Sequence, residues 1–161
     1  MIGQTDLEKE ITVINVNQEM SPVKVFHTVG YGGRKPSDFV ALLNQHDVTL
    51  VVDVRLRPDR ASIGAYVKAK APDKGIEKLL GERNIGYLSI IELGNIFLDQ
   101  EDWQARYGVL LEKAGDILRA RLLQIKGPFC LLCAERKASD CHRKQIAECL
   151  VRKGYEAVNI E

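Results

Sequence analysis

The sequence predicts a three-layer α/β fold, doubly wound, in which helices cover both faces of a mainly parallel sheet of about five strands. Two observations carry this prediction. From residue 24 onward, short apolar runs of strand length alternate with longer stretches of helical period. These runs are apolar on both faces, as strands are when helices cover a sheet on two sides. In such sheets ligands bind beyond the carboxyl ends of the strands, so the loops at those ends are the expected place for a site.

The strands and helices are expected in strict alternation. Five runs have the residue types of strands: 23–32, 49–55, 86–90, 129–134 and 155–161. Four stretches between them have helical period: 37–47, 73–84, 101–124 and 141–153. Ser37, behind Pro36, is expected to cap the first helix. Asp140 is expected to cap the last, which places residues 141–143 in its first turn.

One domain, residues 24–161, is predicted, preceded by residues 1–23 as an N-terminal arm or an edge strand. The 161 residues include 23 Lys and Arg against 22 Asp and Glu, which excludes a protein that is basic or acidic as a whole. No apolar stretch reaches the roughly 18 residues of a membrane helix. The chain starts without the pattern of a secretion signal, so we expect a cytoplasmic protein with reduced thiols and no membrane contact.

Four loops at the predicted carboxyl ends of strands join turn residues to polar residues: 30–34, 53–60, 92–95 and 133–143. Loops are commonly polar, so an ordinary surface loop is the alternative for each of them. Segment 55–83 holds eight basic and four acidic residues and is the most basic part of the chain. This local charge predicts an acidic small molecule or a nucleic-acid-derived compound as the ligand.

Asp53 and Arg55 are two residues apart and therefore share one face of a strand. They are expected to form a local ion pair, or Asp53 orients Arg55 to bind an anion through its planar guanidinium. In the glycine-rich loop, Tyr31 and Gly32 are candidates for the ligand site because backbone N–H groups there can approach a ligand closely. A plain strand-to-helix turn is the alternative for this loop.

The four cysteines fall into two groups. Cys130 and Cys133 are three residues apart on a strand and face opposite sides, which argues against a redox pair. Cys130 and Cys149 are expected to be small core residues. Cys133 and Cys141, at a strand end and a helix start, are candidate catalytic thiols, because a helix N-terminus lowers the pKa of a thiol.

Glu135 and His142 are the candidates for moving a proton, and Arg136 and Arg143 for holding a negatively charged group. The alternative is a set of salt bridges that hold the loop. His142 is expected to be neutral, because the helix dipole repels an imidazolium. No metal is predicted, because an adjacent Cys-His pair diverges on a helix, and no cofactor is predicted.

Several stretches resemble the prokaryotic family known as domain of unknown function family 488: TVGYGG (28–33), LVVDVR (50–55), IGYLSIIELGN (85–95) and LLCAERKASDCHRKQIAECLVRKGYEAVNI (131–160). The resemblance covers residue 25 to the end, and its most specific part is the C-x-E…C-H-R string. It implies polar family positions at Asp53, Arg55, Leu93, Gly94, Cys133, Glu135, Cys141, His142 and Arg143. The family pattern has His-Ser where this chain has Tyr31 and Gly32. The resemblance implies a fold and a site, but no reaction.

Three functions follow as hypotheses. The first is an enzyme that acts on a phosphorylated or nucleic-acid-derived substrate in an anion-binding cleft at the strand ends. The second is a thiol enzyme that transfers sulfur through Cys133 or Cys141. The third is a non-catalytic module that binds nucleic acid or protein through segment 55–83, although few aromatics argue against stacking on single strands. The oligomeric state stays open.

Overall fold

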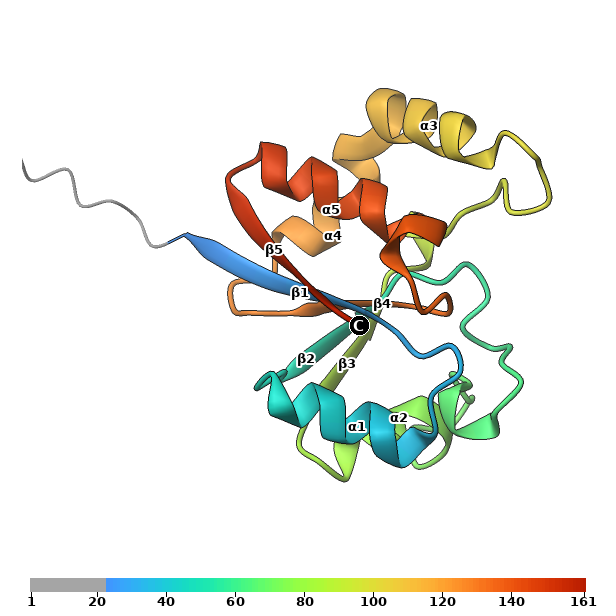
Figure 1. Cartoon of the computed structure of the whole chain (residues 1–161), viewed down its shortest axis with the longest axis vertical. Helices are drawn as coiled ribbons and strands as arrows, with labels where there is room; N and C mark the ends of the chain where they lie inside the picture. The colour runs from blue at the N-terminus through green and yellow to red at the C-terminus, as the bar shows by residue number, and fades with distance from the viewer. Residues whose placement is uncertain (1–22) are drawn as a thin grey trace, which may run out of the picture.

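The protein folds around one sheet of five parallel strands in the order β3-β2-β4-β1-β5. The structure, a computed structural model, describes residues 23–161, so the prediction for residues 1–22 lies outside the described part. The strands are β1 (Lys24–Gly30), β2 (Leu50–Asp53), β3 (Gly86–Ser89), β4 (Cys130–Cys133) and β5 (Tyr155–Ile160). The helices are α1 (Pro36–Gln45), α2 (Gly75–Gly81), α3 (Trp103–Leu118), α4 (Ala120–Leu123) and α5 (Arg143–Arg152). Helices α1 and α2 lie on one side of the sheet and α3, α4 and α5 on the other, which confirms the three-layer prediction (Figure 1).

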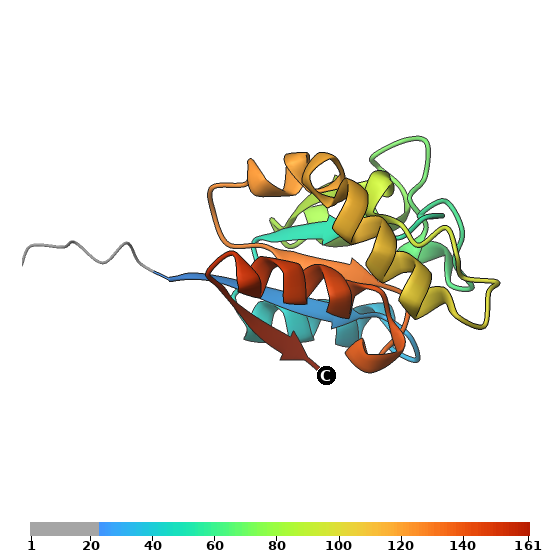
Figure 2. The ribbon, with the colours of Figure 1, turned by 90° about the horizontal axis from the view of Figure 1, so that it is seen from above.

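The order of the strands explains which helices share a face. From β1 the chain moves outward to β2 and β3, and it then returns to β4 and continues to β5. Crossovers between parallel strands are right-handed, so the helices of the outward and return paths lie on opposite faces. Strand β4 enters between β1 and β2, every strand pairing is parallel, and the arrows of β1, β2, β4 and β5 in Figure 2 point toward the same side. The carboxyl ends of β1, β2 and β4 therefore lie next to one another.

Alternating residues of each strand contribute to two separate cores. Val52 and Leu131 pack in the core beneath α3 and α5, whereas Val51 and Leu132 pack in the core beneath α1 and α2. This is the two-residue period of strands whose faces are both covered. Cys130 and Cys133 belong to different cores, which confirms that they face opposite sides of the sheet.

Two predicted helix caps are wrong. Helix α1 begins at Pro36 with Lys35 before it, since a proline fits the first position of a helix, where its missing N–H is not needed. Asp140 ends a short 3-10 turn, Ala138–Asp140, and Cys141 is extended, so α5 begins only at Arg143.

The predicted helix 101–124 is divided at Arg119 into α3 and α4. None of the helices in residues 23–161 has the length and apolar character of a membrane span.

Candidate functional site

A cavity of about 130 Å³ lies at the carboxyl ends of β1, β2 and β4. Its lining comes from the loops that follow these strands and from the start of α5, and consists of Tyr31, Arg55, Leu56, Arg57, Arg60, Leu98, Cys133, Ala134, Glu135 and His142. Five of the ten site residues proposed from sequence thus share one cavity wall. The other five, which do not line it, are Gly32, Asp53, Arg136, Cys141 and Arg143.

Asp53 and Arg55 form a buried ion pair at the end of β2. Arg55 donates from Nε to Oδ1 of Asp53 at 2.9 Å and from Nη2 to Oδ2 at 2.6 Å, and its backbone N–H also reaches Oδ1 at 3.0 Å. The Asp53 side chain is fully buried. Burial alone would lower the pKa of Arg55, but the hydrogen bonds and charge of Asp53 raise it above its usual value. Asp53 and Arg55 therefore form the local ion pair that was one of the two sequence readings, and anion binding by Arg55 stays a prediction.

Two tyrosines complete this network. The hydroxyl of Tyr87 donates to Oδ2 of Asp53 at 2.6 Å, and burial raises the Tyr87 pKa, as does the nearby Asp53 carboxylate. Arg55 donates to the hydroxyl of Tyr31 at 3.3 Å, and its guanidinium carbon is 5.1 Å from the centre of the Tyr31 ring. Sequence reasoning missed Tyr87, because only the register of β2 against β3 brings it to Asp53.

The glycine-rich loop after β1 packs against the loop after β4. The N–H of Gly32 donates to the carbonyl of Ala134 at 2.8 Å, and the N–H of Tyr31 donates to the carbonyl of Cys133 at 3.3 Å. A Cβ atom at Gly30 would overlap the carbonyl of Glu135, so this close approach requires glycine. The backbone N–H of Gly32 is therefore used inside the protein, contrary to its predicted approach to a ligand.

Arg143 is fully buried and holds the loop that precedes α5. Its Nη1 donates to the carbonyl of Glu135, and its Nη2 donates to the carbonyl of Arg136 at 2.9 Å. The Arg136 side chain is exposed. The sequence assigned both arginines to a ligand anion, but the partners of Arg143 in the structure are main-chain oxygens. An anion-binding role for either stays a prediction.

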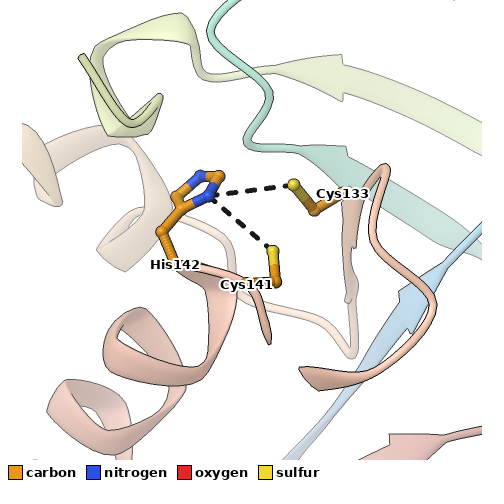
Figure 3. Close-up of side chains that lie close together, drawn as sticks. All are labelled: Cys133, Cys141 and His142. Carbon is orange, nitrogen blue, oxygen red and sulfur yellow. Dashed lines mark hydrogen bonds between the residues drawn. The ribbon is translucent and has the colours of Figure 1, made fainter. Parts of the chain in front are cut away.

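The side chains of Cys133, Cys141 and His142 converge, and two of them, Cys133 and His142, line the cavity (Figure 3). Nδ1 of His142 lies 3.8 Å from Sγ of Cys133 and 3.7 Å from Sγ of Cys141. All three residues are buried, with 2–3% of their surface exposed. The sequence argument that Cys141 and His142 diverge does not hold, because an extended Cys141 precedes the helix instead of lying in it.

The contact made by Nε2 of His142 determines whether Nδ1 donates or accepts a hydrogen bond. Nε2 lies 2.8 Å from the carbonyl oxygen of Val54, which can only accept a hydrogen bond, so Nε2 carries a proton. In the neutral ring, Nδ1 therefore presents a lone pair toward the two sulfur atoms. Val54 was not identified from sequence, since a backbone carbonyl leaves no signal in the residue types.

The two thiols at this cluster differ in acidity. The hydrogen bond from Cys133, together with His142, lowers the pKa of Cys141 to about 6 against the effect of burial. The same hydrogen bond and burial raise the pKa of Cys133 well above its usual value. Burial alone would lower the pKa of His142, but Cys141 raises it, which opposes the neutral form expected from the sequence.

Glu135 contacts the cluster and also lines the cavity. Its Oε2 is 3.0 Å from Sγ of Cys133, and the residue is partly exposed where it lines the cavity. Burial opposes its ionisation, yet the hydrogen bond from Cys133 lowers the Glu135 pKa below its usual value. The site thus combines a carboxylate, two thiols and an imidazole at one end of the sheet.

A larger cavity, of about 510 Å³, lies elsewhere, between α3 and α5. Arg119 and Cys149 are in its wall, but none of the residues that line the strand-end cavity is. Size alone favours this larger cavity, whereas the shifted pKa values of Cys133, Glu135 and His142 favour the strand-end cavity. We take the chemistry as the better guide, because a site needs groups that can bind or react.

Comparisons with known proteins give one match. No curated protein and no solved structure matches the chain. One protein-family model covers residues 35–150, a range that includes Asp53, Arg55 and the whole Cys133–Arg143 stretch. This agrees with the resemblance found in the sequence, and the chain belongs to the family described as Domain of unknown function DUF488.

Proposed function

We propose that the protein is an enzyme that binds a small anionic substrate in the strand-end cavity, with Glu135 as the group that accepts a proton. The observation that carries this proposal is the composition of one cavity wall, in which Arg55 and Arg60 lie with Cys133, Glu135 and His142. Cationic and proton-transfer groups in a single concave site are the usual basis for assigning a reaction centre.

Arg60 is the residue best placed to attract an anion. Arg55 is paired with Asp53 and Arg57 with Asp59, whereas Arg60 is exposed and forms no ion pair with any residue in 23–161. An unpaired guanidinium at the edge of a cavity binds phosphate or carboxylate through its planar set of donors. The positive charge that reaches a substrate therefore comes mainly from Arg60.

The size of the cavity limits the substrate. A volume of about 130 Å³ is smaller than the roughly 300–1,000 Å³ of sites for drug-sized ligands. Leu56 and Leu98 add apolar surface to the wall. We therefore expect a phosphate or carboxylate group, or a molecule of that size, to enter, while the rest of a larger substrate stays outside.

Thiol chemistry with transferred sulfur has less support. Cys133 lines the strand-end cavity, but Cys141 lines a separate cavity with Trp103 and Lys144. The two thiols are only 3% and 2% exposed. A sulfur carrier must present its thiol to a second molecule, and thiols as buried as these are poorly placed for that transfer.

Nucleic-acid binding through segment 55–83 also has less support. Three basic residues of the segment are paired with acidic residues of the same segment: Arg57 with Asp59, Lys68 with Glu77 and Lys78 with Glu82. These pairs reduce the positive potential that would attract a phosphate backbone.

The proposal is tested by thermal unfolding of chelator-treated protein with inorganic phosphate, phosphate esters, nucleoside monophosphates and small carboxylates. At least one compound should raise the Tm of the wild type, and Arg60→Ala should abolish the shift. Arg83→Ala is the matched control, because Arg83 is exposed but lies outside the cavity. A panel without any shift, or an equal shift in Arg60→Ala, contradicts the proposal.

The stabilising compound then tests the role of Glu135. Wild type should convert this compound, or an ester of it, to product, whereas Glu135→Gln should bind it without turnover. Equal rates for the two proteins would remove Glu135 from the reaction.

A further inference from the structure

We propose that Cys133, Cys141 and His142 bind a zinc ion whose fourth coordination position faces the strand-end cavity. This inference deepens the proposed function, on which it rests for the use of the site, since it supplies the cavity with a reactive centre. It is argued from the placement of three side chains and one backbone carbonyl.

The distances match those that zinc requires. Tetrahedral zinc, bonded at about 2.3 Å to sulfur and about 2.0–2.1 Å to nitrogen, places sulfur and nitrogen about 3.6 Å apart. In the structure Nδ1 of His142 is 3.8 Å from the Cys133 sulfur and 3.7 Å from the Cys141 sulfur. All three donor atoms lie within 4.8 Å of one another (Figure 3). The two nitrogen–sulfur distances are therefore within about 0.2 Å of those around a zinc ion.

The imidazole is already held as a metal ligand is held. Histidines that bind metals donate their other ring N–H to a carboxylate, a carbonyl or water, which fixes the tautomer and the ring orientation. Nε2 of His142 makes this contact with the carbonyl of Val54 at 2.8 Å. Val54 directly follows β2, is buried, and donates its own N–H to the carbonyl of Leu132 in β4, so the ring is fixed to the sheet while Nδ1 points toward both thiols.

The charges and the ligand types favour zinc over magnesium or calcium. Two thiolates neutralise the double positive charge of the ion, so the loaded site is neutral and can remain buried. Thiolate and imidazole are typical zinc ligands, whereas magnesium and calcium prefer oxygen. Cys130 and Cys149 cannot take part, because they do not belong to this group of donor atoms.

Three protein ligands leave one position for water or substrate, which is the pattern of catalytic rather than structural zinc. Cys133, His142 and Glu135 all line the strand-end cavity, so this position is reached from the side where Glu135 lies. The group of donors found in residues 23–161 contains no fourth ligand.

This arrangement assigns the reaction class as hydrolysis. Water at the open position gives a proton to Glu135, and the resulting hydroxide forms a bond to the electrophilic carbon or phosphorus of the substrate. The bond from that atom to the leaving group breaks, and the leaving group takes the proton from Glu135. The water molecule supplies the hydroxyl group of one product and the hydrogen of the other, so no oxidant or reductant is needed.

Cobalt(II) titration of reduced, metal-free protein tests the site without a substrate. One cobalt per chain should bind, with an intense thiolate-to-cobalt charge-transfer band and the visible bands of tetrahedral cobalt, and zinc should displace both. Cys133→Ala and Cys141→Ala should each weaken cobalt binding. The loss should exceed the roughly 10- to 100-fold that follows removal of a residue that only hydrogen-bonds to a metal ligand. Glu135→Gln should keep the stoichiometry, because Glu135 is not a ligand.

Cys130→Ala is the matched control, because Cys130 is an equally buried cysteine on the same strand but on the other face of the sheet. It should bind cobalt as the wild type does, and far-ultraviolet circular dichroism verifies that each variant is folded. Absence of the charge-transfer band in the reduced wild type overturns the proposal whether or not the variants fold. Unchanged bands in both Cys133→Ala and Cys141→Ala overturn it as well.

The two proposals fail separately. Anions that stabilise chelator-treated protein through Arg60, combined with no cobalt charge transfer, would leave the anion site standing and reject the metal. Cobalt bound through both thiols, combined with no anion effect, would keep the metal site and reject the proposed substrate class.

Discussion

Two polar clusters lie at the same edge of the sheet and use their polar atoms differently. In the Asp53 cluster, Arg55 and Tyr87 surround the carboxylate with hydrogen bonds of 2.6–3.1 Å. In the Cys133 cluster, Cys133 and His142 make short outward contacts to Glu135 and Val54, at 3.0 and 2.8 Å, but Nδ1 of His142 lies 3.7 and 3.8 Å from the two sulfurs. Short and complete hydrogen bonding indicates a cluster that stabilises the fold, whereas long contacts among good metal ligands leave room for an ion. The comparison separates a structural cluster from a candidate reaction centre.

The largest expected effect comes from removing the carboxylate of the structural cluster. Asp53→Ala leaves the Arg55 guanidinium buried without its counter-charge, which costs about 3–5 kcal/mol in comparable pairs. Urea unfolding measures the change. The control is Asp59→Ala, which breaks the exposed pair with Arg57 and should change stability little, because water already screens that pair. Similar losses in the two variants would show that the Asp53 cluster is not structural.

Zinc should stabilise the protein only through the Cys133 cluster. At free zinc 100 times above the dissociation constant, binding to the folded state alone adds about 2.7 kcal/mol to the free energy of unfolding. The gain should vanish in Cys141→Ala and persist in Asp59→Ala. Unfolding curves with zinc and with a chelator give the difference, and an equal gain in Cys141→Ala would place the zinc elsewhere.

Tyr87→Phe tests a single contact of the structural cluster. The variant removes one hydrogen bond to a buried carboxylate, a type worth about 1.5–3 kcal/mol. Tyr155→Phe serves as the control, since the Tyr155 hydroxyl makes no hydrogen bond within residues 23–161. Thermal unfolding should show a lower Tm for Tyr87→Phe alone, and indistinguishable variants would mean that this hydroxyl is dispensable.

The smallest expected effect is the ionisation of the Cys141 thiol, which should leave the fold unchanged. Cys141 has a pKa of about 6, so in metal-free protein one thiolate should appear as the pH rises through that value. An ordinary thiol ionises near pH 8.5. Ultraviolet thiolate absorbance follows the change, and subtracting the curve of Cys141→Ser isolates it. A first thiolate that appears only near pH 8.5 would contradict the lowered pKa.

The strand pattern could be predicted because the alternation of side chains along a strand depends only on neighbouring residues in the sequence. Val51 and Val52 alternate between the two cores, as the covered faces of β2 require, and this is visible in a few consecutive residues. The same period correctly separated Cys130 from Cys133. Asp53 and Arg55 were paired correctly from the same period, although β2 ends at Asp53 and Arg55 lies just beyond it.

The contacts of the site could not be predicted, because they depend on register and on one helix end. Tyr87 reaches Asp53 only through the pairing of β2 with β3. Cys141 and His142 converge because Cys141 is extended and α5 starts only at Arg143. With Asp140 as the N-cap, the helix would have started two residues earlier. The contacts of Arg143 with the carbonyls of Glu135 and Arg136 hold this loop, and no local propensity encodes them.

X-ray absorption at the zinc edge of the loaded protein tests the central claim most directly. The account predicts two sulfur neighbours at about 2.3 Å and lighter atoms, one from imidazole, at about 2.0–2.1 Å. The sulfur contribution should fall by half in Cys141→Ala and stay unchanged in Cys130→Ala. A first shell made only of nitrogen and oxygen would contradict the assignment of Cys133, Cys141 and His142 as a zinc site.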